Sequence, residues 1–243
     1  MTTDGTITLR SAARSHTGLV RKNNQDSGYA GPNFLLIADG MGGHAGGDVA
    51  SAITVARLAE LDRETGGEDA LEILRTSILD ANDRICRGVA EQPELAGMGT
   101  TVTALLRAPG NRFALAHIGD SRGYVYRDGE LHAVTHDHTF VQMLVDEGRI
   151  TAEEADTHPQ RSVVMKVLGD VGTSPDLDLS LREAHVGDRW LLCSDGLYNH
   201  FEAPEEIHAL LAGENLADNI EDLVDTALKR GGTDNITAIA FRS

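Results

Sequence analysis

The stretch FLLIADGMGGHAGGDVA, Phe34–Ala50, decides how this chain is interpreted. An apolar run typical of a buried strand ends at Asp39, and five glycines follow within eight positions before a helix-like sequence begins. A glycine-rich loop between a strand and a helix can cradle a phosphate, hold a metal ion or serve only as a turn. The rest of the sequence must decide among these three interpretations.

A nucleotide-binding loop is the weakest of the three. Gly40, Gly42 and Ala45 satisfy the spacing of the dinucleotide fingerprint, and Glu60 lies about where a ribose-binding acid is found. However, a second helical pattern follows where a parallel strand is required, and Asp39 would place a carboxylate at the mouth of an anion site. A Walker loop is excluded because Gly-Lys-Ser/Thr does not occur in the sequence. A nucleotide-binding oxidoreductase is therefore a poor alternative.

Composition narrows the class of protein further. The 243 residues are 41% hydrophobic, and 38 acidic against 21 basic residues give a formal net charge of -17, which argues against capture of nucleic acid or anionic lipid. Cys86 and Cys193 are far apart, so we expect neither a disulfide framework nor a CxxC metal clip. We find no signal-peptide pattern and no apolar run of membrane-spanning length, so the expected location is cytoplasmic.

Hydrophobic patterning predicts a sheet-rich α+β fold. The expected strands are Thr6–Ala13, Phe34–Ala38, Thr101–Leu106, Arg112–Ile118, Gly123–Arg127, Trp190–Ser194 and Asn235–Phe241. Helical spacing marks Asp48–Leu61, Leu71–Ile85 and Leu216–Ala227, Asp128-Gly129 is a typical hairpin turn, and Thr151 to Glu154 form a capping box. This order lacks strict βαβ alternation, so we expect one domain, an antiparallel sandwich with helices outside.

Four aspartates recur in one local setting, at the end or the start of an apolar strand beside glycine or a small residue. They are Asp39, Asp120, Asp195 and Asp234. A single aspartate of this kind is most often a turn former, but four indicate a shared role. If these strand ends meet at one edge of the sandwich, the carboxylates repel one another and require cations. Oxygen ligands without cysteine or spaced histidine favour Mg²⁺ or Mn²⁺ over Zn²⁺.

An ordered set of motifs runs through the whole chain. They are Arg21-x-Asn23-Asn24-Gln25-Asp26, Ala38-Asp39-Gly40-Met41-Gly42-Gly43-His44, Gly97-Met98-Gly99-Thr100-Thr101, His117-Ile118-Gly119-Asp120-Ser121-Arg122, Thr135-His136-Asp137-His138, Ser194-Asp195-Gly196-Leu197 and Gly231-Gly232-Thr233-Asp234-Asn235-Ile236-Thr237. With them the chain resembles the metal-dependent Ser/Thr phosphatases of the 2C type, most closely their bacterial branch. The resemblance implies a four-layer α-β-β-α sandwich, two antiparallel sheets flanked by helix pairs. It also implies one catalytic domain over residues 1–243, with a flap-like excursion at about 148–172.

The resemblance also implies a binuclear metal centre. In the family's pattern Asp39 bridges two tightly bound Mn²⁺ or Mg²⁺ ions, the Gly40 carbonyl binds one of them, and Asp195 and Asp234 complete the ligand set. Arg21 matches the arginine that grips the substrate phosphate.

Further positions are implied around that centre. Asp120, together with Asp195, matches a third and weaker metal site, which Ser162 is expected to reach. Asp26 and Asn235 match residues that support the ligands from behind.

The function that follows is hydrolysis of phosphoserine and phosphothreonine on proteins, by in-line attack of a hydroxide that bridges the two metals. The expected partners are phosphorylated proteins, among them Ser/Thr kinases and their substrates. We expect a monomer that binds no nucleic acid. A catalytically inactive phosphatase-like module that only binds phosphoproteins is the alternative, although the metal-matching acids and Arg21 are all present.

The sequence departs from the family's pattern at several positions. Met41 stands where many eukaryotic members carry a histidine proposed as general acid, so we expect a metal-bound water as proton donor, with His44 as a second candidate. Tyr198 and His200 follow the Asp195 motif where a small hydroxyl residue is more usual at the first position, which predicts an altered cleft rim. The motif at residues 135–138 is expected to be a hydrogen-bonded turn.

Overall fold

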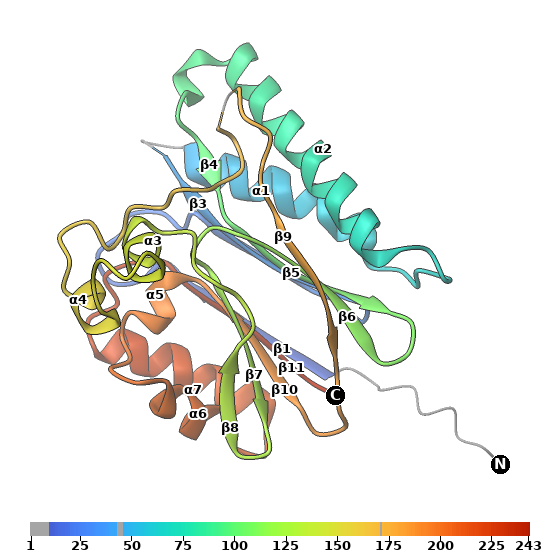
Figure 1. Ribbon diagram of the computed structural model, residues 1–243, viewed down its shortest axis with the longest axis vertical. Coiled ribbons are helices and arrows are strands. Elements are labelled where there is room, and N and C mark those ends of the chain that lie inside the picture. The colour runs from blue at the N-terminus through green and yellow to red at the C-terminus, as the bar shows by residue number, and fades with distance from the viewer. Residues whose placement is uncertain (1–9, 43–45, 171) are drawn as a thin grey trace.

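The fold is a sandwich of four layers. The structure, a computed structural model, describes residues 10–42, 46–170 and 172–243. Two antiparallel sheets face one another, and a pair of helices covers the outer side of each sheet (Figure 1). The predicted α-β-β-α sandwich is therefore confirmed.

In each sheet the spatial order of the strands differs from their order in the sequence, so strands distant in sequence lie side by side. The first sheet runs β1 (Arg10–His16), β11 (Ile236–Arg242), β10 (Arg189–Cys193), β7 (Arg122–Arg127), β8 (Glu130–Ala133). The second runs β2 (Asp26–Ala30), β3 (Phe34–Met41), β5 (Val102–Ala108), β6 (Arg112–Ile118), β9 (Asp178–Glu183), and β4 (Gly99–Thr100) pairs with β3. The first and last strands of the described chain, β1 and β11, are antiparallel neighbours.

The helices divide between the two outer faces. Those over the second sheet are α1 (Gly46–Leu58) and α2 (Ala70–Glu91), and those over the first are α6 (Pro204–Leu211) and α7 (Leu216–Lys229). The shorter helical segments are η1 (Ala59–Leu61), η2 (Pro93–Leu95), α3 (Phe140–Asp146), α4 (Ala152–Asp156) and α5 (Asp195–Tyr198). Within the described ranges, none of these helices combines the length and apolarity needed to cross a membrane.

The central strands are apolar on both faces because each is buried on both sides. In β3, Phe34 and Leu36 belong to the core beneath α1 and α2, whereas Leu35 and Ile37 belong to the core between the sheets. A strand covered on both faces reads as a continuous apolar run, which explains why β3 is visible in the sequence.

Most predicted elements are observed, with shifted ends. The strand expected at Thr6–Ala13 begins at Arg10 in the described residues, and residues 6–9 lie outside them. The hairpin at Asp128-Gly129 is confirmed, with φ of 53° and 89°, as is the capping box of Thr151 with Glu154. Strands β2 and β9 were not predicted, because each is short and partly exposed and so lacks a strong apolar pattern.

Three aromatic rings join the two sheets. Phe113 lies 4.9 Å from the ring centroid of Phe241 and 5.8 Å from that of Trp190, and the rings of Trp190 and Phe241 stack at 5.8 Å. All three side chains are at most 2% exposed. The cluster therefore fixes the spacing of the sheets from the inside.

We expect Phe113→Ala to lower the free energy of unfolding by about 3–5 kcal/mol, because it leaves a cavity between Trp190 and Phe241. Urea unfolding followed by the fluorescence of Trp190, the only tryptophan in the sequence, measures this change. Val186→Ala is the control, because Val186 is 87% exposed and its truncation should change stability by no more than about 0.5 kcal/mol. Equal effects of the two substitutions would contradict the assigned core.

Candidate functional site

Asp39 is held rigidly near the end of β3. Its backbone N–H donates to Thr101 Oγ1 at 2.9 Å, and its carbonyl accepts from Thr101 N at 2.9 Å and from Thr100 Oγ1 at 2.8 Å. The next residue, Gly40, packs so closely that a Cβ there would lie 2.1 Å from the carbonyl oxygen of Gly47. Only glycine fits, so the backbone at the predicted Gly40 ligand position is bare of side chain.

The other predicted acids arrive from separate elements. Asp120 follows β6, Asp195 begins α5 directly after β10, and Asp234 precedes β11. Burial first, and then the charges of neighbouring acids including Asp26, raise the pKa of Asp39 well above its ordinary value. The structure thus places the four strand-end aspartates that the sequence singles out within electrostatic reach of one another.

Burial and neighbouring charges raise the pKa values of two of these acids to different extents. Burial, followed by the charges of Asp120, Asp234 and Asp26, raises the pKa of Asp195 to about 8. Burial, followed by the charge of Asp137, raises the pKa of Asp120 to about 6. Like charges held in a poorly solvated site favour retention of protons, or binding of cations in their place.

Asp26 supports this group from the neighbouring strand. It lies directly opposite Asp39 in the β2–β3 register, and its Oδ2 accepts a hydrogen bond of 2.7 Å from Ser194 Oγ. Its other oxygen, Oδ1, is buried without a hydrogen-bond partner among the described residues. Because a buried unpaired carboxylate oxygen is costly, this atom marks a place for a further positive or donor group.

Asn235 ties down the loop that carries Arg21. Its Oδ1 accepts from Gln25 N at 2.8 Å, and its Nδ2 donates to the carbonyls of Thr17 and Asn23 at 2.8 and 2.9 Å. One amide side chain therefore secures both ends of the segment between residues 17 and 25.

Arg21 reaches from this loop to the acids. Its Nη2 donates to Asp234 Oδ2 at 2.7 Å, across 213 sequence positions. The hydrogen bond to Asp234, with the charges of Asp234, Asp195 and Asp39, raises the pKa of the Arg21 guanidinium above its ordinary value. The two paired side chains are 52% and 33% exposed, so this bridge contributes little stability and exchanges easily for another anion.

Two other residues predicted to belong to the site are not seen in contact with these acids. Ser162 is exposed in the loop after α4, and its hydroxyl makes no hydrogen bond to Asp120 in the part of the chain that the structure describes. His44 lies outside the described residues. Across residues 10–42, 46–170 and 172–243, no three acidic, histidine or cysteine side chains already converge on one point, and Asp234 is turned toward Arg21.

Tyr198 is partly buried, and its side chain contacts the residues around Asp120. Its hydroxyl donates to the carbonyl of Asp120 at 3.0 Å, and the guanidinium of Arg122 lies 3.8 Å above its ring. Residues 135–138 are hydrogen-bonded as expected, but to other elements and without forming a turn: Asp137 accepts three hydrogen bonds from Arg122, and His138 N donates to Gly119 O. The sequence pattern indicates no supporting role for Tyr198 or Arg122, because their partners are distant in sequence.

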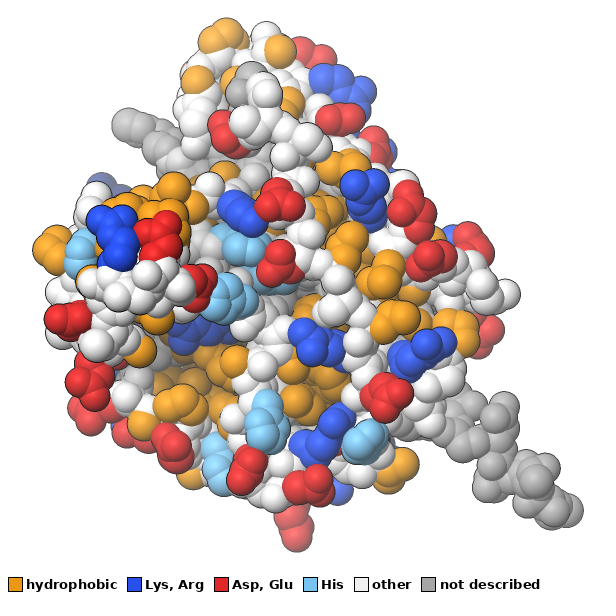
Figure 2. Space-filling view, viewed as in Figure 1, with side chains coloured by type: hydrophobic (Ala, Val, Ile, Leu, Met, Phe, Trp, Pro, Cys, Tyr) orange, Lys and Arg blue, Asp and Glu red, His pale blue; other side chains and the backbone are white. Residues whose placement is uncertain are grey.

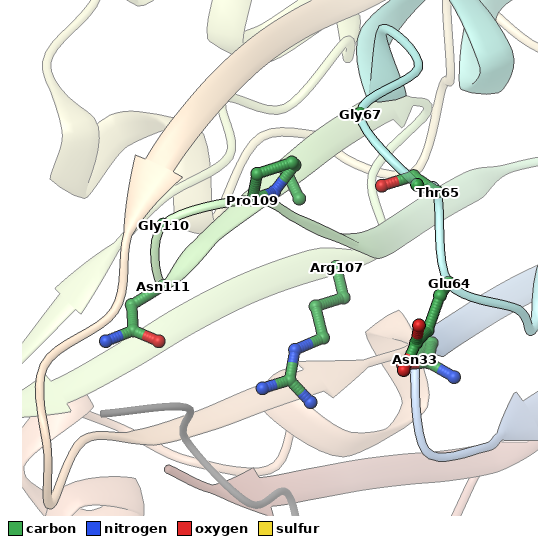
Figure 3. Close-up of a pocket in the computed structure, with 10 residues that line it drawn as sticks. Asn33, Glu64, Thr65, Gly67, Arg107, Pro109, Gly110 and Asn111 are labelled. Carbon is green, nitrogen blue, oxygen red and sulfur yellow. The ribbon is translucent and has the colours of Figure 1, made fainter. Parts of the chain in front are cut away.

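Two cavities lie away from the acids. One, of about 490 Å³, is at the end where β3 begins, and Figure 3 shows Arg107 between the turns of Asn33 and Asn111 there. The other, of about 480 Å³, lies in the hollow between the sheets that Figure 2 shows, beside His117 and Arg182. None of the four strand-end aspartates lines either cavity, so neither is the candidate site.

Comparison with known sequences identifies the class. A family model described as protein phosphatase 2C matches residues 14–235. The serine/threonine protein phosphatase PstP of Mycobacterium tuberculosis is 52% identical over 234 residues, 96% of this chain and 45% of that protein. The chain thus spans about half the length of that relative. The serine/threonine phosphatase stp of Listeria monocytogenes is 34% identical, over 93% of this chain and 92% of its own.

Solved structures agree with the sequence relatives. A crystal structure of the Mycobacterium tuberculosis phosphatase PstP/Ppp has a TM-score of 0.93 at 51% identity, over 97% of this chain and 99% of that one. The PstP catalytic domain in complex with two manganese ions has a TM-score of 0.89 at 49% identity, over 97% and 98%. This chain therefore belongs to the protein phosphatase 2C family, and the resemblance seen in the sequence is confirmed.

The raised pKa of Asp195 predicts how stability depends on pH when no cation is present. A carboxyl group with a higher pKa in the folded state binds its proton more tightly there, so it stabilises the fold fully below its unfolded value of about 3.9. That contribution is lost as the pH rises toward about 8. Thermal unfolding in a chelator should therefore show a melting temperature that falls from pH 5 to pH 8.

Asp195→Asn is the matched variant for this measurement, because asparagine cannot ionise. Its melting temperature should fall less over the same range, and Mn²⁺ should raise the wild-type value more at pH 8 than at pH 5. Parallel pH curves for the two proteins would refute the placement of Asp195 among buried acids.

Proposed function

We propose that this chain is a protein serine/threonine phosphatase that depends on Mn²⁺ or Mg²⁺. The observation that carries the proposal is the partly buried Asp39 carboxylate near the end of β3, within electrostatic reach of Asp26, Asp120, Asp195 and Asp234, with the Arg21 guanidinium paired to Asp234. Membership of the protein phosphatase 2C family supports it, and the manganese-bound PstP catalytic domain supports the choice of ion. The intact acids and Arg21 do not favour an inactive binding module.

The residues present suit divalent cations. The proposed donors are carboxylates and the backbone carbonyl of Gly40, which are oxygen ligands that hard ions prefer. The unpaired buried oxygen of Asp26 and the raised pKa of Asp195 both indicate that negative charge is under-compensated at this place. We assign Asp39, Gly40, Asp195 and Asp234 to two tightly held ions.

Two such ions, when bound, supply a water of lowered pKa as nucleophile and neutralise charge on the phosphoryl group. Arg21 binds the substrate phosphate with planar, paired N–H donors that match its oxygens. Asp39 and Asp195 keep their positions through backbone hydrogen bonds and helix α5, so the reacting groups meet without rearrangement of the sheets.

The bridge between Arg21 and Asp234 has a role in this scheme. Because this bridge is partly exposed and weak, a bound cation would replace Arg21 as the partner of Asp234 and would leave the guanidinium free for the substrate phosphate. In this scheme the cation pairs with Asp234, and the substrate phosphate pairs with Arg21.

The proposal extends to partners and surroundings. We assign phosphorylated proteins as substrates, including Ser/Thr kinases and proteins that they modify, and signal transduction as the setting. Both cysteines are free thiols, which supports a reducing, cytoplasmic location. We also propose one catalytic domain over residues 1–243, acting as a monomer, with residues 148–172 as a flap beside the site and Asp120 as a ligand of a third, weaker cation that Ser162 approaches.

Metal-stripped protein should hydrolyse p-nitrophenyl phosphate and a phosphothreonine peptide only after Mn²⁺ or Mg²⁺ is added. Asp39→Asn and Asp234→Asn should each reduce activity at least about a hundredfold, because cation stabilisation of the transition state is worth several kcal/mol. Calorimetric titration of Mn²⁺ should show weaker binding in both variants. Binding without turnover in the wild type would favour the inactive module.

Arg21→Ala should lower kcat/KM for the phosphopeptide about 10- to 100-fold, since a charged hydrogen-bond pair to phosphate is worth about 1.5–3 kcal/mol. Arg21→Lys should fall between the wild type and Arg21→Ala, because lysine keeps the charge without the planar donors. The Mn²⁺ concentration for half-maximal activity should change little in either variant.

Arg63→Ala is the control for Arg21, because Arg63 also forms an exposed ion pair, with Glu68, in the connection between α1 and α2. It should leave both kinetic parameters unchanged. If Arg63→Ala and Arg21→Ala behave alike, Arg21 has no special part in phosphate binding.

A further inference from the structure

Tyr198 connects two acids that come from different sheets. It occupies the last position of α5, three residues after Asp195, so both side chains belong to one helical turn. Its hydroxyl donates at 3.0 Å to the carbonyl oxygen of Asp120, 78 positions away in sequence. The Tyr198 side chain therefore ties the helical turn that begins with Asp195 to the backbone of Asp120.

The neighbours of Asp120 are fixed by other contacts. His138 N donates to Gly119 O at 2.8 Å, and Gly119 N donates back to His138 Nδ1 at 3.2 Å. On the other side, Thr103 Oγ1 donates to the carbonyl of Ser121 at 2.8 Å. These bonds hold the turn to β5 and to the 135–138 motif, whereas the hydroxyl of Tyr198 holds the Asp120 peptide to α5.

The ring of Tyr198 is itself prevented from turning. Arg122 lies over it at 3.8 Å, and Asp137 fixes the Arg122 guanidinium through bonds of 3.0, 3.0 and 2.7 Å. Arg122 also donates to the Tyr124 hydroxyl at 3.4 Å. A stacked and paired guanidinium leaves the tyrosine a single position, so its hydroxyl acts as a fixed spacer.

We infer that Tyr198 is a positioning residue, which sets the separation of Asp120 and Asp195 and thereby the affinity of the weak cation site that these two acids share. The inference rests on the proposed function for the assignment of that site. A hydrogen bond to the peptide of a ligand residue orients its carboxylate, and loss of such supporting contacts typically weakens metal binding about 10- to 100-fold. Tyr198 thus affects the affinity for a third cation and does not contact the substrate.

The test compares the wild type with Tyr198→Phe and Tyr124→Phe in the full chain. Tyr198→Phe removes the hydroxyl bonded to Asp120 and keeps the ring under Arg122, whereas Tyr124→Phe removes a hydroxyl that touches Arg122 but not Asp120. Mn²⁺ binding to metal-stripped protein is measured by isothermal titration calorimetry. We expect Tyr198→Phe to weaken the weakest binding step about tenfold, with the two tighter steps unchanged, and Tyr124→Phe to match the wild type.

Three results would overturn the inference. They are an unchanged weakest step in Tyr198→Phe, equal weakening in Tyr198→Phe and Tyr124→Phe, and binding of only two ions by the wild type. Hydrolysis of p-nitrophenyl phosphate by the wild type is recorded in parallel. Because binding is read without turnover, an inactive wild type would refute the proposed function while the calorimetry still decides the role of Tyr198.

Discussion

Repulsion among carboxylates buried at one edge of the sandwich is the constraint on which the rest of this structure depends. Burial and neighbouring acids raise the pKa values of Asp39, Asp120 and Asp195, so each would move toward solvent if its backbone allowed. The fold prevents this by attaching each acid to a different rigid element: Asp39 lies within β3, Asp120 follows β6, and Asp195 opens α5. The aromatic core between the sheets fixes the distance between the layers that carry them.

A network of polar side chains transmits this rigidity to the site. Ser194 accepts from Thr237 N and donates to Asp26, so it joins the two sheets immediately before Asp195. Asn235 likewise holds the loop that carries Arg21, through hydrogen bonds to the backbone of Thr17, Asn23 and Gln25. The side chains of Ser194 and Asn235 bond to backbone groups or to the supporting acid Asp26, and within the described chain neither side chain bonds to a proposed ligand carboxylate. Each therefore positions charge that it does not itself neutralise.

The sequence predicted the layers and the acids better than the contacts between them. Strands buried on both faces, such as Arg112–Ile118, were recognised to the residue because burial on both sides imposes a continuous apolar run. The strand-end aspartates were recognised because a carboxylate beside glycine after such a run is unusual when repeated. The contact of Tyr198 with Asp120 was not predicted, since 78 positions separate them and local pattern carries no information about that distance.

The order of the paired elements along the chain determines when they can pair during translation. β11 lies between β1 and β10, and Arg21 pairs with Asp234 across 213 positions. A ribosome adds about 5–20 residues per second, so β1 and Arg21 wait many seconds in the nascent chain before their partners emerge. The last strand closes the first sheet and the acidic site in one event. A polypeptide whose translation stops before β11 therefore lacks both the completed first sheet and the completed acidic site. Only a finished catalytic region forms a competent site.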